Sequence, residues 1–397
     1  MQSWCNSAWC LAIYVCFFSL VAAVPNFVFI IADDLGWNDV GYHAATNAYT
    51  PVLDALRADG LEFDRFYVYP KCAPTRTSFF TGSRAHNLGM QNGVGLTGSM
   101  PCSLDLGPGS STSTRSFWTH RLKACNNYQN YLIGKWHCGF FEWADTPLFR
   151  GFDSFLGFYH GTLNYTAFTY DGIVDFTEGN TLITTPSSYG TYATNVWADE
   201  AVEIIKDIAI SGNAGNEQPF TLTVAFNAPH SPIEAIQPYK NQVKALSTHT
   251  FKGDDVTRID YVSMVRAMDK QIEKIVETLK GQRINNVPMW KNTWVWFFSD
   301  NGAVNEYGSS YPLRGAKETL FEGGVRAPAF VTGGPLPDDL VGERTDQLVH
   351  ISDIAKTVCT QSGSDCSDVE MDGVDLTSLI ENTAATNTEL EDRYIVL

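Results

Sequence analysis

Four short apolar runs along the chain each stop at a polar or charged cluster. The runs cover residues 27–32, 131–134, 220–226 and 294–298, and the clusters that follow them begin at Asp33, Lys135, Asn227 and Ser299. Short, largely apolar runs of this kind are typical of strands that are buried on both faces. We therefore expect four buried strands that each end at residues capable of chemistry.

Helical patterns lie between these runs. Residues 51–59 begin with Pro51 after a potential capping residue, Thr50, and end before Gly60, while residues 198–208 and 261–279 repeat apolar positions at a spacing of three and four. Strands that alternate with helices predict an α/β fold with a large, mostly parallel sheet covered by helices on both faces. In such sheets ligands bind beyond the carboxyl ends of the strands, where the four clusters would meet.

Two of the clusters together offer three carboxylates and one amide. These are Asp33, Asp34, Asp300 and Asn301. Oxygen donors of this kind suit a hard divalent cation such as Ca²⁺ or Mg²⁺, and no His/Cys spacing in the chain is typical of zinc. Either pair alone is also typical of a turn or a helix cap. Their joint placement after buried strands favours the metal site.

Two lysines and two histidines complete the candidate chemistry. They are Lys135, His137, His230 and Lys317. Each of these alone would be read as ordinary structure or solvated surface. Together with a metal, they suit the transfer of a phosphoryl or sulfuryl group, because the negative oxygens need neutralising and the leaving alkoxide needs a proton.

Composition narrows the class of protein further. The chain has 397 residues, 44% of them hydrophobic, and carries 27 Lys and Arg against 44 Asp and Glu, for a net charge of −17. This is a globular composition, which excludes disorder, collagen and coiled coil, and fits one large domain or two smaller ones. The acidic balance argues against a nucleic-acid partner. An anionic substrate would need locally concentrated Lys, Arg or metal.

The N-terminal residues point to the secretory pathway. Residues 1–23 contain no charged side chain, and an apolar run at 11–20 ends in the small residues of Val21-Ala22-Ala23. We predict a cleaved signal peptide over 1–23, with a buried strand or an uncleaved anchor as the alternative. No later segment is apolar enough to span a membrane, so we expect a lysosomal or extracellular protein with a candidate N-glycan at Asn164, in the sequon Asn-Tyr-Thr.

Cysteine usage agrees with this compartment. Loss of the signal would remove three cysteines and leave six, at positions 72, 102, 125, 138, 359 and 366. A secretory route makes disulfide bonds the default expectation. Cys359 and Cys366 could close a short loop and two of the cysteines at 102, 125 and 138 could pair, but spacing alone does not fix the connectivity.

The most specific motif is Cys72-Ala73-Pro74-Thr75-Arg76, which opens a helix-like stretch. With its context, the chain resembles the sulfatase family from Pro25 to about Val374, and in particular the arylsulfatases of the B, I and J group, which are N-acetylgalactosamine-4-sulfatase-like. The matching stretches are residues 25–37, 72–82, 134–137, 150–153, 299–302 and 312–326. The resemblance implies the alkaline-phosphatase-like fold.

The resemblance also implies a modified residue at the centre of the site. A formylglycine-generating enzyme would oxidise Cys72 to formylglycine, with Pro74 and Arg76 as part of its recognition signal. In the family's mechanism one hydroxyl of the aldehyde hydrate attacks sulfur and the alcohol leaves. The second hydroxyl is then deprotonated and expels sulfate, a step that a serine or a thiol could not complete.

Roles for the remaining candidates follow from the same resemblance. One Ca²⁺ would be held by residue 72 together with Asp33, Asp34, Asp300 and Asn301. Arg76 would orient the hydrate, and His137 would act as the base, with Lys135 beside it on the anion. His230 and Lys317 would bind the sulfate and protonate the leaving oxygen.

The resulting functional prediction is a sulfuric ester hydrolase that acts on sulfated glycans or aryl sulfates. The alternatives are a phosphodiester or phosphonate hydrolase on the same scaffold, and a non-catalytic matrix protein that binds sulfated glycans. We expect the catalytic domain to cover residues 24–390. Residues 391–397 would begin a strand of a smaller C-terminal domain that is missing or truncated here.

Overall fold

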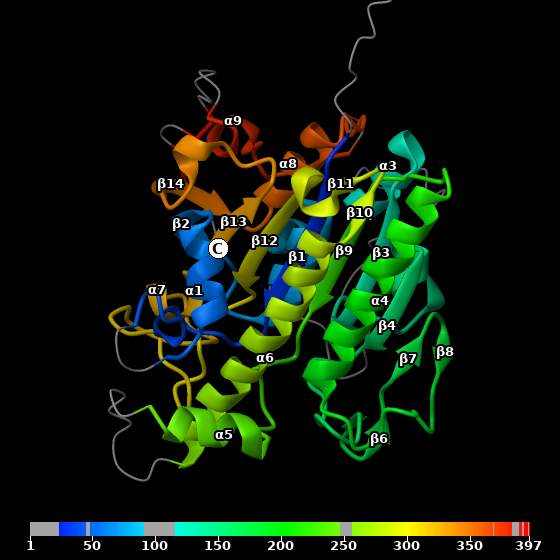
Figure 1. Cartoon of the computed structure of the whole chain (residues 1–397). Coiled ribbons are helices and arrows are strands. Elements are labelled where there is room, and N and C mark those ends of the chain that lie inside the picture. The colour runs from blue at the N-terminus through cyan, green and yellow to red at the C-terminus, as the bar shows by residue number, and fades with distance from the viewer. Residues whose placement is uncertain are drawn as a thin grey trace, which may run out of the picture.

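A large mixed sheet runs through the molecule, and helices pack on both of its faces (Figure 1). The computed structural model describes residues 24–44, 48–90, 116–246, 256–367, 369–382, 389–390, 393–395 and 397. The predicted signal peptide at 1–23 and Cys102 lie outside the described residues.

Ten strands form this sheet within the described residues. In order across the sheet they are β14 (Arg344–His350), β2 (Leu61–Tyr67), β13 (Ala329–Gly333), β12 (Thr293–Ser299), β1 (Asn26–Ala32), β9 (Phe220–Ala225), β3 (Gln129–Lys135), β4 (Ser154–Phe158), β7 (Thr177–Glu178) and β8 (Thr181–Leu182). Two small ribbons pair β5 (Thr169–Tyr170) with β6 (Ile173–Val174) and β10 (Arg283–Ile284) with β11 (Val287–Pro288).

The four strands predicted from the apolar runs are neighbours in the sheet. They stand in the order β12-β1-β9-β3, and each adjacent pair is parallel. All residues of β1, β9 and β12 are buried, as expected for strands covered on both faces. Parallel neighbours place their carboxyl ends at one edge, so the clusters that follow them are brought together. The sheet becomes antiparallel at β13 and at β7.

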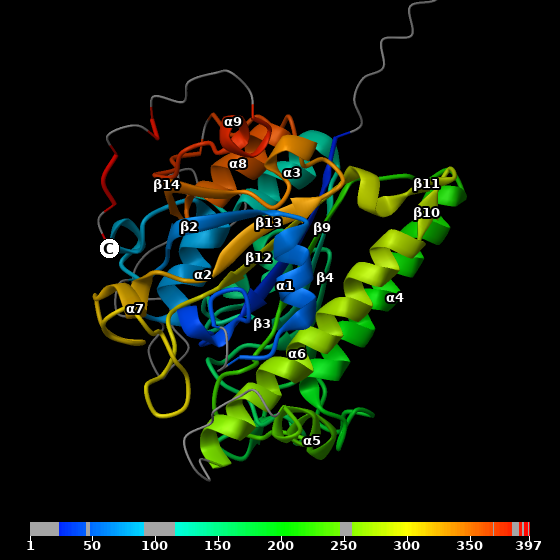
Figure 2. The ribbon, with the colours of Figure 1, turned by 60° about the vertical axis from the view of Figure 1, so that its left-hand side comes forward.

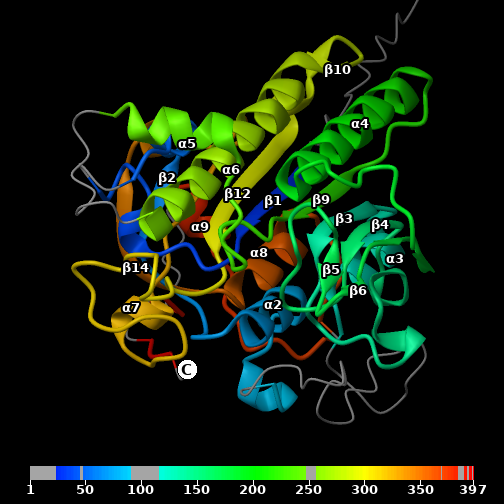
Figure 3. The ribbon, with the colours of Figure 1, turned by 90° about the horizontal axis from the view of Figure 1, so that it is seen from below.

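Helices form one layer on each face of the sheet (Figures 2 and 3). One face carries α1 (Pro51–Ala58), α4 (Ala193–Asn213), α5 (Gln237–Lys244) and α6 (Val256–Gly281); the other carries α2 (Cys72–Thr81), α3 (Trp118–Asn126), α8 (Asp353–Gln361) and α9 (Thr377–Ile380). The short helices are α7 (Glu322–Val325), η1 (Trp37–Asp39), η2 (Ala85–Leu88), η3 (Trp143–Asp145), η4 (Pro147–Arg150), η5 (Met289–Asn292) and η6 (Asp338–Leu340).

Strand β1 contributes side chains to the hydrophobic clusters on both faces of the sheet. Phe27, Phe29 and Ile31 join the cluster under α2, α3 and α8, whereas Val28 and Ile30 join the cluster under α4 and α6. Successive side chains of a strand point to opposite faces, so an uninterrupted apolar run is required when both faces are covered.

Helix α1 begins where the sequence predicts, but its first turn is capped differently. The Thr50 hydroxyl accepts a hydrogen bond from the Gly41 N–H at 2.7 Å and donates to Asp54 at 2.9 Å. The free N–H groups of α1 instead meet the carboxylate of Asp269 on α6, which accepts from Leu53 at 2.8 Å. A residue distant in sequence therefore caps the helix.

We expect Asp269→Ala to lower the free energy of unfolding by about 1–2 kcal/mol, because the buried N–H groups at the start of α1 would lose their acceptor. Denaturant unfolding would measure this. Glu277→Ala is the control: Glu277 is exposed on the same helix, so its loss should change stability by no more than about 0.5 kcal/mol. Equal effects of the two substitutions would contradict the capping role.

The described cysteines confirm one of the expected disulfide bonds. Cys359 and Cys366 are bonded and close the short loop after α8. Cys125 is exposed and Cys138 is buried, and these two are not bonded to each other. Pairing that involves Cys102 stays a prediction.

The C-terminal residues contact helix α8 through Arg393. Its guanidinium donates to the buried carboxylate of Asp353 at 2.8 and 3.1 Å. Residues 393–395 have irregular backbone. The boundary at 390 and a further domain that begins at 391 stay predictions. Among the described helices, none combines the length and apolar sequence that crossing a bilayer requires.

Candidate active site

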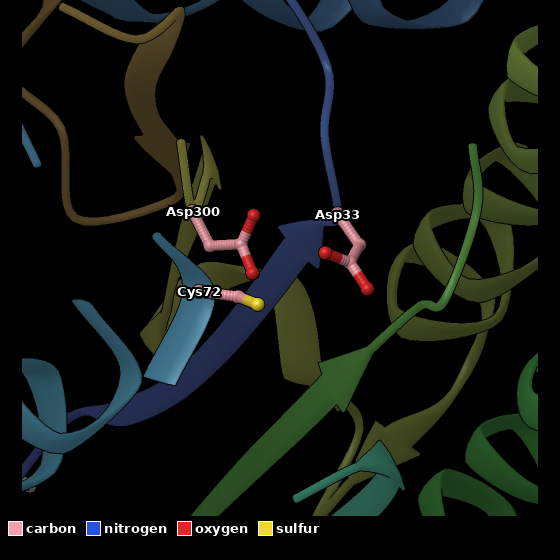
Figure 4. A group of neighbouring side chains, drawn as sticks. All are labelled: Asp33, Cys72 and Asp300. Atoms are coloured by element: carbon pink, nitrogen blue, oxygen red, sulfur yellow. The ribbon is translucent and has the colours of Figure 1, made fainter. Parts of the chain in front are cut away.

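Three acidic or thiol side chains converge at the carboxyl edge of the sheet (Figure 4). Asp33 follows β1, Asp300 follows β12, and Cys72 is the first residue of α2; one potential ligand atom from each lies within 4.8 Å of the others. The parallel pairing of Ala32 with Ser299 places Asp33 and Asp300 at equal height on adjacent strands. All three side chains are buried.

Asp34 and Asn301 extend this group of oxygens. Asp34 adopts φ 68°, in the left-handed region, and the Asn301 amide donates to its Oδ1 at 2.7 Å. Three buried oxygens nearby, Asp33 Oδ1, Asp34 Oδ2 and Asn301 Oδ1, accept no hydrogen bond from the described residues. Buried acceptors are normally satisfied. Two carboxylates and an amide left open in this way fit a hard divalent cation.

Three cations pair with the three carboxylates of the site. Lys135 lies 2.6 Å from Asp33, Lys317 lies 2.6 Å from Asp34, and Arg76 donates to Asp300 from Nε at 2.9 Å. The fixed charges therefore balance, and a bound divalent cation would leave the site with two net positive charges. A locally positive site can attract an anion even though the whole chain carries −17.

The carboxyl pKa values reflect this balance. Burial raises the pKa of Asp33, but the charges of Lys135 and His230 outweigh burial and bring it below its usual value. Burial and the neighbouring charge of Asp33 raise the pKa of Asp300. Two carboxylates this close repel each other when both are ionised. A divalent cation bound between them would offset that repulsion.

The Cys72 thiol is not an activated nucleophile in this environment. Burial raises its pKa, although Lys135 and Lys317 act in the opposite direction. The thiolate is the reactive form of cysteine, and a raised pKa leaves little of it at neutral pH.

His230 faces the site from the loop after β9. Its Nε2 lies 3.6 Å from Asp34 Oδ2, while its Nδ1 lies 2.7 Å from the carbonyl oxygen of Ser231 and donates to it. The Tyr165 hydroxyl lies 2.8 Å from the carbonyl oxygen of His230 and holds this loop. The Nε2 atom of His230 is therefore directed toward the group of carboxylates.

His137 enters from the loop after β3. Burial and the charges of Lys135 and Arg76 hold its pKa well below the usual value, so the imidazole is neutral. Its ring packs against Gly161, where an added Cβ would come within 2.7 Å of the ring Cε1. A neutral imidazole held by close packing is suited to accept a proton.

We expect Gly161→Ala to lower kcat, by about tenfold or more, because the new methyl group would displace the His137 ring by a fraction of an ångström. Steady-state kinetics would measure the change. Gly281→Ala is the control, since a Cβ there meets nothing within 4 Å. An unchanged kcat in Gly161→Ala would show that the position of His137 does not limit turnover.

The structure also shows positioning residues that the sequence analysis did not single out. The Tyr261 hydroxyl on α6 lies 2.8 Å from the carbonyl oxygen of Asp34 and 2.7 Å from the Asp39 carboxylate. Asp39 also accepts the N–H of Ser309 at 3.0 Å. In the sequence, Tyr261 fits the apolar repeat of a helix, and nothing in that pattern marks it as a support for Asp34.

The sequon asparagine is engaged in local contacts. Asn164 Nδ2 donates to the Glu234 carboxylate, and its Oδ1 accepts the N–H of Ala167 at 2.7 Å. Its side chain is half-buried. An N-glycan at this position stays a prediction.

Comparison with known proteins identifies the family of this protein. The Sulfatase family model matches residues 25–364, and the chain belongs to that family. This confirms the family resemblance drawn from the motifs and the fold that it implies.

Two relatives narrow the comparison. The chain is 31% identical over 358 residues to mouse Arylsulfatase J, covering 89% of this chain and 55% of the relative. It is 30% identical over 378 residues to mouse N-acetylgalactosamine-6-sulfatase, again over 89% of this chain but 65% of the relative. The chain thus spans a little over half to about two thirds of the length of these relatives.

A solved structure has the same architecture. Ps i-CgsB, in complex with k-i-k-neocarrahexaose, matches with a TM-score of 0.75 and 28% identity, covering 90% of this chain and 76% of that one. A sulfatase from Pseudoalteromonas, PsFucS1, matches with a TM-score of 0.69 at 24% identity and shares the fold.

Proposed function

We propose that this chain hydrolyses sulfuric esters. The observation that carries the proposal is the convergence of Cys72, Asp33 and Asp300 within 4.8 Å. Each of the two carboxylates is paired with a cation, Asp33 with Lys135 and Asp300 with Arg76. Membership of the sulfatase family supports the same reaction. An anionic ester, a nucleophile and a leaving oxygen would each find a matching group in this arrangement.

The proposal includes maturation of Cys72 to formylglycine by a formylglycine-generating enzyme. Cys72, Pro74 and Arg76 stand at the start of α2 with the spacing that the motif requires. The hydrate of formylglycine would supply a nucleophilic hydroxyl and a second hydroxyl for release of sulfate. Because burial raises the pKa of the unmodified thiol, modification would replace a poor nucleophile.

We propose Ca²⁺ as the cofactor, one ion per site, held by Asp33, Asp34, Asp300, Asn301 and residue 72. Bound there, the cation would lower the pKa of the hydrate and neutralise a sulfate oxygen. The three unsatisfied buried oxygens support this ligand set.

The other residues divide into two groups around the ester. Arg76 is fixed by Asp300 and by the Lys135 carbonyl oxygen, to which it donates at 3.1 Å, and it would orient the residue 72 hydrate. His137, neutral and beside Lys135, would accept the proton that starts release of sulfate. His230 and Lys317 line the open side of the site and would hold the sulfate and protonate the leaving oxygen.

We propose a sulfated glycan as the natural substrate and the secretory pathway as the route. The neocarrahexaose complex of Ps i-CgsB supports an oligosaccharide substrate class. The Cys359–Cys366 bond supports an oxidising compartment.

The deciding experiment compares nitrophenyl sulfate with the matching bis-nitrophenyl phosphate. The chain would be produced with a formylglycine-generating enzyme and assayed with Ca²⁺. Preferred hydrolysis of the sulfate would support the proposal. Preferred hydrolysis of the phosphate diester would favour the alternative on the same scaffold, and binding of sulfated glycan without any hydrolysis would favour a non-catalytic protein.

A further inference from the structure

A cavity of about 350 Å³ opens beside the residues assigned to the leaving oxygen. Asp34, His230 and Lys317 form its inner wall. If these groups hold the sulfate and protonate the leaving oxygen, the alcohol part of the ester must occupy this cavity. This placement of the alcohol rests on the proposed function.

The size and lining of the cavity fit a sugar ring better than an aromatic ring. Its volume lies at the low end for small-molecule sites, which leaves room for one ring. The outer wall carries the side chains of Ser231, Asn305, Glu306, Tyr307 and Glu318. These are predominantly hydrogen-bonding groups, and carboxylates accept hydrogen bonds from sugar hydroxyls.

The two glutamates are placed by ordered backbone. Glu306 precedes Tyr307, whose ring lies 5.5 Å from that of Tyr261 and whose carbonyl oxygen accepts a hydrogen bond from Arg258 at 3.0 Å. The Glu318 N–H donates to the Pro70 carbonyl oxygen at 2.7 Å. The backbone that carries both glutamates is therefore held at the wall of the cavity, and their side chains are exposed beside it.

The charge of the outer wall is negative. Lys71 lies 3.8 Å from Glu318 and offsets part of its charge, but the lining formed by described residues includes no basic side chain apart from His230 and Lys317. Both of these belong to the sulfate end. A second anionic group on the sugar would therefore face carboxylates without a cation of its own.

We propose that this cavity takes a single sugar ring whose only charge is the sulfate to be removed, and that Glu306 and Glu318 reject rings with a second anionic group. The carboxylates accept hydroxyl hydrogen bonds from the neutral ring and repel a further sulfate or carboxylate. Glu306 contributes more to this selection, because Lys71 offsets Glu318.

The test compares monosulfated with disulfated monosaccharides on the mature full chain. Galactose and N-acetylgalactosamine carrying sulfate at position 4 or 6 are set against their 4,6-disulfates, and kcat/KM is measured as sulfate release. We expect the wild-type chain to prefer the monosulfates. Glu306→Gln should raise the ratio of disulfate to monosulfate kcat/KM by about three- to fivefold, and Glu318→Gln by less.

Glu277→Gln is the matched control because it removes the same charge elsewhere. Glu277 is exposed on α6, sixteen positions beyond Tyr261, or about 24 Å along the helix. It should leave the ratio unchanged. An unaltered ratio in Glu306→Gln and Glu318→Gln, or a wild-type preference for the disulfates, would overturn the inference, while continued hydrolysis of nitrophenyl sulfate would leave the proposed function intact.

Absence of any sulfate ester hydrolysis would refute the proposed function. In that case a binding measurement would still test the inference. Calorimetric titration of the Cys72→Ala chain, in the presence of Ca²⁺, would compare the same sugars. Tighter binding of the monosulfate, with the difference reduced by Glu306→Gln, would support the selection. Equal binding, or no binding of either sugar, would overturn it.

Discussion

Cys72→Ala is expected to reduce turnover by on the order of 10³-fold or more, because it removes the residue from which the nucleophile is made. The fold should persist, since the substitution deletes one sulfur atom at the start of α2 and leaves the pairing of Arg76 with Asp300 in place. Thermal unfolding should shift by only a few degrees, corresponding to about 1 kcal/mol.

Cys72→Ser separates this chemistry from simple loss of a side chain. A serine offers one hydroxyl, so it could accept the sulfuryl group but could not expel it. We expect a single turnover followed by arrest, with a stable sulfate ester on the peptide that contains residue 72. Peptide mass spectrometry would detect the ester in the variant and the aldehyde in the wild-type chain. Fully active wild-type protein that carries only a thiol at residue 72 would refute the mechanism.

Asp300→Asn is expected to lose nearly all activity and to lower stability. Asp300 accepts hydrogen bonds from Arg76, and both side chains are buried. Removing one charge of a buried pair costs about 3–5 kcal/mol, because the remaining charge is left uncompensated. The variant should also respond less to calcium. In the wild-type chain, Ca²⁺ at a hundredfold excess over its Kd should add about 2.7 kcal/mol of stability.

Asp353→Asn is the matched control for the calcium effect. Asp353 is also buried and pairs with an arginine, Arg393, but it belongs to α8 and is not among the residues that converge with Cys72. Its substitution should lower the melting temperature while the increment caused by calcium stays the same. If exhaustive chelation changed neither the activity nor the melting temperature of the wild-type chain, the metal assignment would be wrong.

Much of the fold could be predicted because its centre is built from strands buried on both faces. Such strands leave short, largely apolar runs, and β12, β1, β9 and β3 were all recognisable in this way. Helices α4 and α6 likewise follow from an apolar repeat that matches the turn of a helix. The antiparallel outer strands β7 and β8 were not predicted, because two residues each are too short to show a period.

The partners within the site could not be predicted from the sequence. Arg76 and Asp300 lie 224 positions apart, and Asp269 caps α1 from 216 positions away. Local patterns contain no information about which distant acid meets which donor. The same holds for Tyr261, whose ring fits an apolar stripe while its hydroxyl supports Asp34.

The sequence by itself determined the four central strands and the helices α1, α4 and α6, because burial and helical periodicity act on neighbours in the chain. It also determined the residues available for chemistry and the family to which the chain belongs. Only the tertiary structure decided which charges balance one another, which oxygens remain open to a cation, and that Glu306 and Glu318 share a cavity with Lys317. These properties depend on distances between segments that are far apart in the sequence; the parallel packing of β12 against β1, which brings Asp33 beside Asp300, is one example.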